Sequence, residues 1–366
     1  MQKRLVLMLS VGVLASAVPA RAQFYTQHNL VSDGAAVPAD RFDPNLVNAW
    51  GLVSSPTSPW WSANNGTATS TLYDGAGVPR PLVVGIPGAP TGIVFNGATG
   101  FVVRSGTVAA PARFIFATED GAIAGWAPTV NPTQAIVAAD RSSSGAVYKG
   151  LAIGTAPSGA TFLYATDFHN GVVDIFDSTF TRIGSFTDHR LPRGYAPFGI
   201  QNVSGTLYVT FAKQNAARHD DVAGPGHGFV DAFDLAGQLV RRVASRGRLN
   251  SPWGVALAPA TFGAFAGDLL IGNFGDGRIN AFEPSMHRDG EQRRKGQLRS
   301  AACPTLSIDG LWALQFGNGA GSGSKDTLYF TAGPNGEKNG LFGTIVPAQA
   351  PAKCDGDDNE EGENED

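Results

Sequence analysis

The amino-acid sequence predicts an all-β protein, a six-bladed β-propeller, on three observations. The 366 residues include 47 glycines and 23 prolines but only 16% charged residues, which indicates many tight turns and few solvated helix faces. Short apolar runs joined by Asp-Gly or Asn-Gly recur, and such dipeptides are typical of β-hairpins. A unit of roughly 50 residues recurs along the chain, a length typical of propeller blades.

Each repeat opens with a short strand-like segment that contains a glycine beside bulky residues. The five glycine-bearing copies are residues 49–52, 90–93, 148–151, 197–200 and 252–255. A sixth copy, residues 310–314, carries Leu311 at the position where we expect the glycine. We predict that these segments are the innermost strands, where a missing side chain lets neighbouring backbones approach around the channel.

A pair of strands joined by a tight turn follows the opening strand in the clearest repeats. These pairs are residues 114–119 with 122–126, 162–167 with 172–177, 268–273 with 278–283, and 328–331 with 341–345. Because residues 286–299 are long, basic and polar, we expect them to leave blade five as a loop. An open ring would expose strand edges. We therefore predict that residues 25–31 close it as the outer strand of the last blade, beside residues 341–346.

The two ends of the chain differ from the body. Lys3 and Arg4 precede an apolar run of fourteen residues and then Ala20-Arg21-Ala22, a pattern typical of a signal peptide over residues 1–22. Fourteen residues are too few to span a bilayer, although a retained anchor is the alternative. We expect a secreted or periplasmic protein with the propeller at residues 23–350, no transmembrane segment after signal cleavage, and a disordered acidic tail at residues 351–366.

The two cysteines, Cys303 and Cys354, both lie near the C-terminus. In an oxidising compartment such a pair predicts a disulfide, with two free thiols as the alternative. The net charge of −4 depends on eight acidic residues after residue 354, and the body is nearly neutral. Since no basic stripe is present, we expect no nucleic-acid partner, and we expect a monomer.

Polar residues gather in the loops that would share one face of the propeller. These are the loops that lead into each first strand and those that join second to third strands. The wider set includes Lys149 and Asp220. The ligand-face candidates are Glu119, Asp120, Asn170, His189, Lys213, His219, His227 and Asp276.

Oxygen-bearing side chains on this face could hold Ca²⁺, which takes six to eight oxygen ligands. Asn48, Asp167 and Asn273 are the first candidates, with His169 as a general base beside them. Propeller lactonases hold such an ion at the channel mouth, but the acidic residue they carry at the start of the first blade is Asn48 here. The alternative is that Asp167, Asn273 and Asp276 shape β-turns.

Two other groups have two interpretations each. The segment His219-Asp220-Asp221, with His227, could bind zinc or could be a mobile polar insertion. One of Trp60 and Trp61 could stack on a sugar ring, or both could pack in the core.

Several segments resemble a family of uncharacterised secreted bacterial proteins, some of which carry the PEP-CTERM sorting signal. The matching segments are residues 29–33, 44–51, 165–171, 251–254, 272–277, 311–318 and 340–343. The resemblance covers about residues 26–346 and implies an NHL-like six-bladed propeller, without an activity to transfer. The acidic C-terminus departs from the sorted members.

Two functions remain open at this point, so the sequence does not establish whether the protein is an enzyme. The first is a secreted binding or scaffold protein that recognises a small ligand, or a secreted or cell-surface protein, on the polar channel face. The alternative is a Ca²⁺-dependent, lactonase-like hydrolase with its metal at the channel mouth.

Overall fold

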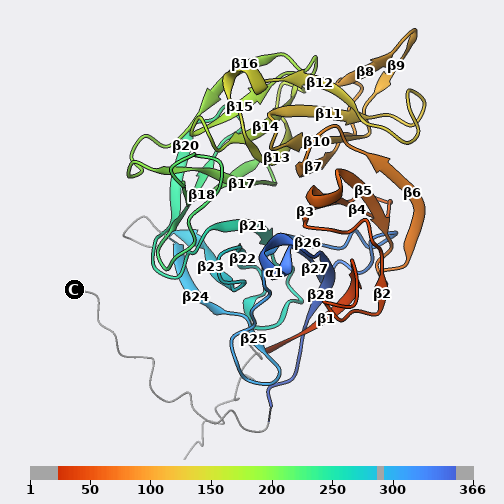
Figure 1. Cartoon of the computed structure of the whole chain (residues 1–366). Coiled ribbons are helices and arrows are strands. Elements are labelled where there is room, and N and C mark those ends of the chain that lie inside the picture. Colours follow the sequence, from red (N-terminus) through yellow and green to blue (C-terminus); the bar gives the residue numbers. More distant parts are fainter. Residues whose placement is uncertain (1–23, 287–291, 352–366) are drawn as a thin grey trace, which may run out of the picture.

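The computed structural model describes residues 24–286 and 292–351, which form six antiparallel blades around a central axis (Figure 1). The expected signal peptide and all but the first residue of the expected tail lie outside the described residues. Among the described residues, no helix is long and apolar enough to cross a membrane.

Each of the first five blades has four strands, and their order in space follows their order in the chain. Blade 1 contains β3 (Ala49–Val53), β4 (Trp60–Asn64), β5 (Thr69–Tyr73) and β6 (Pro79–Gly85). Blade 2 contains β7 (Pro90–Phe95), β10 (Phe114–Thr118), β11 (Ala122–Trp126) and β12 (Ile136–Asp140), with a separate hairpin of β8 (Val102–Ser105) and β9 (Val108–Pro111). Blade 3 contains β13 (Tyr148–Thr155), β14 (Thr161–Asp167), β15 (Val172–Phe176) and β16 (Arg182–Phe186).

Blade 4 contains β17 (Tyr195–Val203), β18 (Thr206–Lys213), β19 (Gly228–Phe233) and β20 (Leu239–Ser245). Blade 5 contains β21 (Pro252–Leu257), β22 (Leu269–Asn273), β23 (Ile279–Met286) and β24 (Gln292–Gln297). The expected loop at residues 286–299 was therefore wrong in part, because β24 pairs antiparallel with β23 as the fourth strand of this blade.

Blade 6 joins the two ends of the propeller. It contains β26 (Leu311–Phe316), β27 (Leu328–Ala332), β28 (Leu341–Pro347) and β1 (Phe24–Ser32), with the short strands β2 (Arg41–Phe42) and β25 (Arg299–Ser300) beside β1. β1 pairs antiparallel with β28 from Tyr25 opposite Pro347 to Ser32 opposite Leu341, which is the pairing that the sequence predicted. The inner strands β3, β7, β13, β17, β21 and β26 each contact the next one, and β26 contacts β3.

The inner-strand glycines allow this close approach. A Cβ atom on Gly199 would lie 2.2 Å from the carbonyl oxygen of Trp253 in the next blade, and one on Gly254 would lie 2.5 Å from that of Trp312. In blade 6 the equivalent residue is Ala313 rather than Leu311, because the Ala313 amide donates to Thr331 as the Gly199 amide donates to Thr210. The sequence alignment of the sixth repeat was therefore displaced by two residues.

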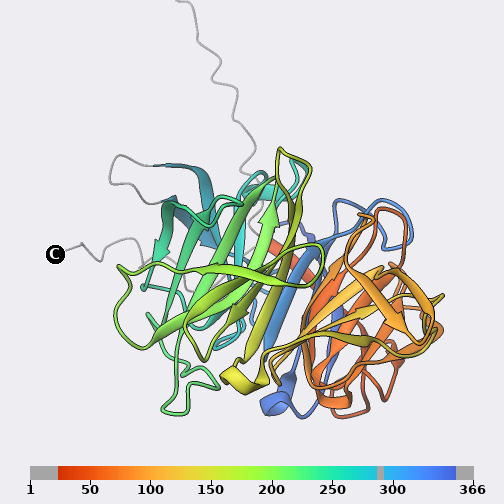
Figure 2. The same ribbon diagram turned by 90° about the horizontal axis from the view of Figure 1, so that it is seen from above.

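Three short helical turns and one four-residue helix lie in the described loops: η1 (Asn65–Thr67), η2 (Ser142–Ser144), η3 (Gly263–Phe265) and α1 (Pro334–Glu337). Figure 2 shows η2 and α1 on the same face of the propeller, the lower one in this view. This face carries the loops that lead into first strands, such as the one with η2, and the loops that join second to third strands, such as the one with α1. Trp60 and Trp61 are both buried, so neither is available to stack on a sugar, and core packing is the correct interpretation.

Candidate functional site

The centre of the propeller is filled by aromatic side chains from four blades. Trp50 stacks on Trp312 with ring centroids 3.6 Å apart, and Trp253 packs edge-on against both rings. Phe198 contacts Trp50 and Trp312 with its edge or at a tilt. These four side chains, which we call the aromatic plug, are at least nine-tenths buried. Further along the inner strands lies a cavity of about 30 Å³, room for about one water molecule.

Lys149 takes the plug position in blade 3 and is only 2% exposed. Its ammonium donates to Glu119, which follows β10, and lies 3.4 Å from Asp220 Oδ1 in the loop between β18 and β19. It also lies 5.2 Å from the centroid of the Trp50 ring, within the range of a cation–π contact. A buried ammonium is costly without such partners, so carboxylates from blades 2 and 4 stabilise its charge.

Two further carboxylates lie within electrostatic reach of this ammonium. Burial raises the pKa of the Asp221 carboxyl, and the charge of Lys149 opposes that change. Burial likewise raises the pKa of Glu337. The charges of Glu119 and Asp221 raise this pKa further, and the charge of Lys149 lowers it. Glu337 Oε2 accepts a hydrogen bond of 2.7 Å from Asn48. We call Asn48, Glu119, Lys149, His219, Asp220, Asp221 and Glu337 the mouth.

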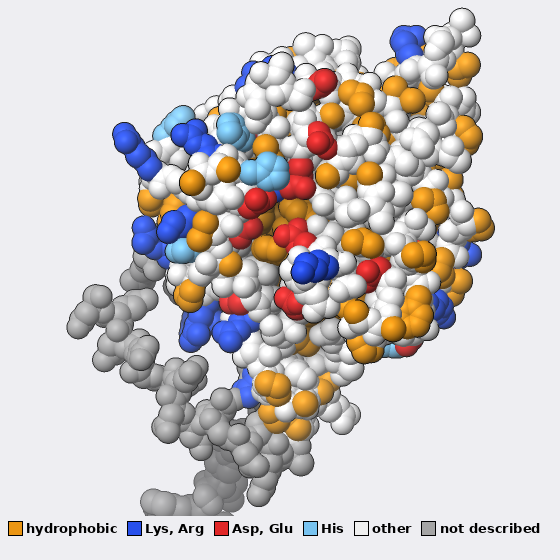
Figure 3. Space-filling model, in the orientation of Figure 1, with side chains coloured by type: hydrophobic (Ala, Val, Ile, Leu, Met, Phe, Trp, Pro, Cys, Tyr) orange, Lys and Arg blue, Asp and Glu red, His pale blue; other side chains and the backbone are white. Residues whose placement is uncertain are grey.

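The mouth forms an acidic hollow. In Figure 3 acidic side chains surround a central depression with hydrophobic atoms at its base. Asn65 donates to Glu119 Oε2 at 2.7 Å, which leaves Oε1 for the ammonium. Asn48 connects the rim to the plug, because its Oδ1 accepts a hydrogen bond from Trp312 Nε1 at 3.0 Å.

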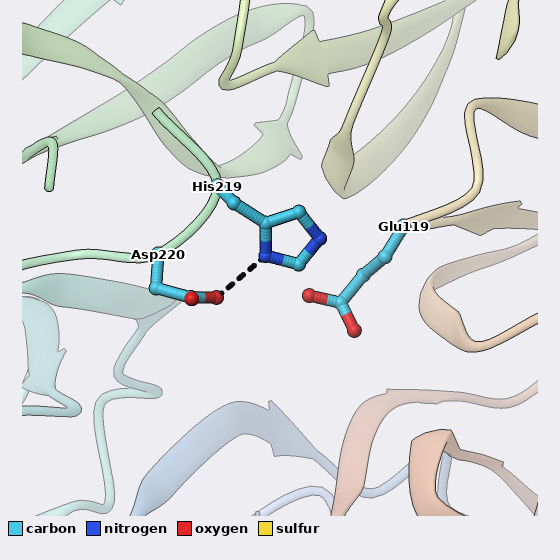
Figure 4. A group of neighbouring side chains, drawn as sticks. All are labelled: Glu119, His219 and Asp220. Atoms are coloured by element: carbon cyan, nitrogen blue, oxygen red, sulfur yellow. Dashed lines mark hydrogen bonds and ion pairs between the residues drawn. The ribbon is translucent and has the colours of Figure 1, made fainter. Parts of the chain in front are cut away.

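His219 extends the mouth toward solvent. Its Nδ1 lies 2.8 Å from Asp220 Oδ1, and its ring is directed toward Glu119 (Figure 4). One ligand atom from each of Glu119, His219 and Asp220 lies within 4.8 Å of the others. The pKa of Asp220 is lowered. Burial alone would raise it, but the hydrogen bond with His219 and the charge of Lys149 outweigh the effect of burial.

The other ligand-face candidates are occupied in local structure or stand apart. Asp120 accepts from the Ala89 amide at 2.8 Å, and His227 Nδ1 lies 2.7 Å from the carbonyl oxygen of Val222. His189 is exposed, and Lys213 ends β18, where it pairs with Tyr195. His169 is half-buried beside Gly145. Of the eight candidates, the structure brings Glu119 and His219 together in the mouth.

The three expected calcium ligands have separate surroundings. Asn48 belongs to the mouth, whereas Asp167 accepts hydrogen bonds from Asn170 and from the Val147 amide in the turn after β14. Asn273 Nδ2 donates to the backbone carbonyl oxygen of Arg248 and to Asp276 Oδ1 in the turn after β22. These contacts fit the interpretation that Asp167, Asn273 and Asp276 shape turns, and Asn170 is the partner of Asp167 in one of them. The Asn273 Oδ1 atom is buried without a hydrogen-bond partner among the described residues.

Cys303 is disulfide-bonded. Its expected partner, Cys354, lies outside the described residues, so the pairing stays a prediction.

Sequence reasoning missed Glu337 and did not single out Lys149. One signal was present for Lys149, because it stands directly before the repeat glycine, where the other glycine-bearing copies have Trp, Thr or Phe. Glu337 gave no such signal, since its turn looks like an ordinary hairpin in the sequence.

These features define a class: a closed six-bladed β-propeller with an aromatic plug and an acidic mouth. No family model matches the chain. Uncharacterized protein L690 of Acanthamoeba polyphaga mimivirus is 32% identical over 347 residues, covering 90% of this chain and 88% of the viral protein. Uncharacterized protein R648 of the same virus is 30% identical over 346 residues, covering 90% and 82%. The chain belongs to the family of these uncharacterised mimivirus proteins.

Neither viral name indicates bacterial origin, export or a sorting signal. Export of this chain stays a prediction. Among solved structures, the WD40 domain of Neurospora crassa Pan2 has a TM-score of 0.49 at 10% identity, covering 91% of this chain and 97% of that one. Virginiamycin B lyase from Staphylococcus aureus has a TM-score of 0.48 at 11% identity, covering 88% and 99%.

Proposed function

We propose that this protein is an exported binding propeller that recognises a small, positively charged organic ligand at its mouth, without chemical turnover. The observation that carries the proposal is the convergence of four carboxylates, from Glu119, Asp220, Asp221 and Glu337, around one buried ammonium. Four carboxyl groups surround one ammonium, so the hollow is acidic. A recess lined by one sign of charge attracts ligands of the opposite sign.

The backbone of the mouth also supports a binding role. Glu337 and Asn48 adopt φ angles of 65° and 47°, in the left-handed region of the backbone that residues other than glycine rarely occupy. Such conformations persist only where the surroundings hold them, and they cluster at ligand sites. Here they position a carboxylate and the amide that donates to it.

Export is part of the proposal and rests on the signal-like pattern of residues 1–22. A monomer is proposed as well, because β1 covers the edge of β28 that an open ring would leave for a second chain.

Calorimetric titration with spermidine tests the binding proposal. We expect binding that weakens as salt rises. In Glu337→Gln, which removes one carboxyl group of the mouth, the affinity should fall by a factor of about ten or more. Asp326→Asn is the matched control, because Asp326 precedes β27 at the end opposite Glu337. Equal spermidine affinity in Glu337→Gln and the wild type, or no binding at low salt, would reject the proposal.

A calcium-dependent hydrolase is the alternative, and the unpartnered Asn273 Oδ1 atom is the observation that favours it. Its test is the calcium content of the purified protein after exchange into metal-free buffer. About one tightly held Ca²⁺ per chain, lost in Asp167→Ala together with lactone or ester hydrolysis, would replace the binding proposal.

A further inference from the structure

We propose that Glu119, His219 and Asp220 form a binding site for a divalent transition-metal ion, such as Zn²⁺, at the outer side of the mouth. The inference rests on the proposed function in one respect, since both use the negative charge of the mouth. It names a different ligand class and a residue, His219, that an organic cation does not need.

The positions of the three side chains fit such an ion. Their ligand atoms lie within 4.8 Å of one another. Atoms that each lie about 2.0–2.2 Å from a zinc ion are at most about 4.4 Å apart. Small side-chain movements would therefore bring all three into coordination. The ligands come from two blades, with Glu119 after β10 and the other two between β18 and β19, so an ion would bridge blades 2 and 4.

Lys149 shows that Glu119 and Asp220 are arranged to accept a positive charge. Its side chain is almost fully buried, yet its ammonium reaches two of the three proposed ligands. Glu119 is held through its other oxygen by Asn65, and Asp220 Oδ2 lies 3.4 Å from Asn215 Nδ2. Partners of this kind orient metal ligands in known sites. Two carboxylates thus already face a positive charge in a fixed arrangement.

The donor set determines the class of metal. Imidazole nitrogen with carboxylate oxygen suits Zn²⁺ and its transition-metal neighbours, whereas Ca²⁺ and Mg²⁺ take oxygen ligands. The ammonium of Lys149 competes with the ion, because both draw on the same oxygens of Glu119 and Asp220. Removal of that ammonium should therefore strengthen metal binding.

The chain provides a matched control for the histidine. His28 Nε2 lies 3.0 Å from Asp40 Oδ2 on the outer strand of blade 6, as an exposed His–Asp pair. No third ligand joins that pair among the described residues. Loss of His28 therefore tests what an isolated His–Asp pair contributes to zinc binding.

Calorimetric titration of the metal-free protein with Zn²⁺ tests the site. We expect one Zn²⁺ per chain in the wild type and in His28→Ala. In His219→Ala the zinc affinity should fall by a factor of about ten or more. Lys149→Met should bind Zn²⁺ about tenfold more tightly, since a like charge on the same two carboxylates is removed. His219 is half exposed, so His219→Ala should fold even if Lys149→Met does not.

Zinc affinity that is equal in the wild type and in His219→Ala would overturn the proposal, as would an equal loss in His28→Ala. Absence of zinc binding in the wild type would overturn it too. The spermidine titration of the wild type separates this inference from the proposed function, because the two titrations use different probes on the same unaltered protein. A result in which spermidine binds and zinc does not would reject the metal site alone.

Discussion

At the scale of the residue, single atoms decide how closely the blades approach. Gly199 has no room for a Cβ because the Trp253 carbonyl of the next blade lies against it, whereas Ala313 fills the same position in blade 6. The sequence could predict this use of glycine because it depends on the backbone alone. It could not place the sixth copy, because the Leu311-Trp312-Ala313 segment offers no glycine by which to align it.

Gly199→Ala should lower the free energy of unfolding by about 1–3 kcal/mol, the usual effect of overpacking. Gly184→Ala is the control, because a Cβ there meets no atom within 4 Å, and its effect should stay within about 0.5 kcal/mol. Urea unfolding of both variants measures the difference. Equal stability of the two would contradict the close packing of β17 against β21.

The mouth residues differ in how far sequence could predict them. Glu119 and His219 follow from the rule that second-to-third loops share a face. Glu337 reaches the mouth through three successive left-handed residues, Asn335, Gly336 and Glu337, and no pattern of residue types predicts that path. Lys149 was one polar residue among many until the structure showed its side chain buried over Trp50.

At the scale of the element, third and fourth strands share a buried polar contact in successive blades. Asp174 in β15 accepts from Arg182 in β16, Asp231 in β19 from Arg242 in β20, and Asn280 in β23 from Gln297 in β24. Asp188, in the segment that joins blade 3 to blade 4, also accepts from Arg242 of blade 4 and from Arg190. These contacts hold outer strands whose faces are half exposed, and the apolar repeat pattern gave no indication of them.

The network in blade 4 should make stability depend on acid pH. Burial favours the neutral form of Asp188, but hydrogen bonds from Arg190 and Arg242 outweigh it and lower the pKa of Asp188 to about 2. Because the folded pKa lies below the unfolded one, the stabilisation is complete above the unfolded pKa and is lost as pH falls toward 2. The loss should be about 2 kcal/mol. Urea unfolding at pH 6, 4 and 2.5 should show it in the wild type but not in Asp188→Asn, and parallel pH profiles would contradict it.

At the scale of the whole molecule, the ring and its closure were predictable because they follow from repeats and from the need to cover strand edges. β1 lies beside β28 as expected, and the inner strands contact one another around the whole circle. The chemical character of the centre was not predictable. It depends on which side chains from different blades meet at the axis, and residues far apart in the chain, such as Lys149, Asp220 and Glu337, come together only in the folded ring.

The aromatic plug determines how a ligand can enter and leave the molecule. Because four aromatic rings fill the axis, a molecule that enters the mouth meets a closed end and must leave by the opening it used. A ligand therefore binds and dissociates through the same opening, which is bordered by the loop that carries His219 and Asp220. A change in that loop would therefore alter both the association and the dissociation rate of a ligand.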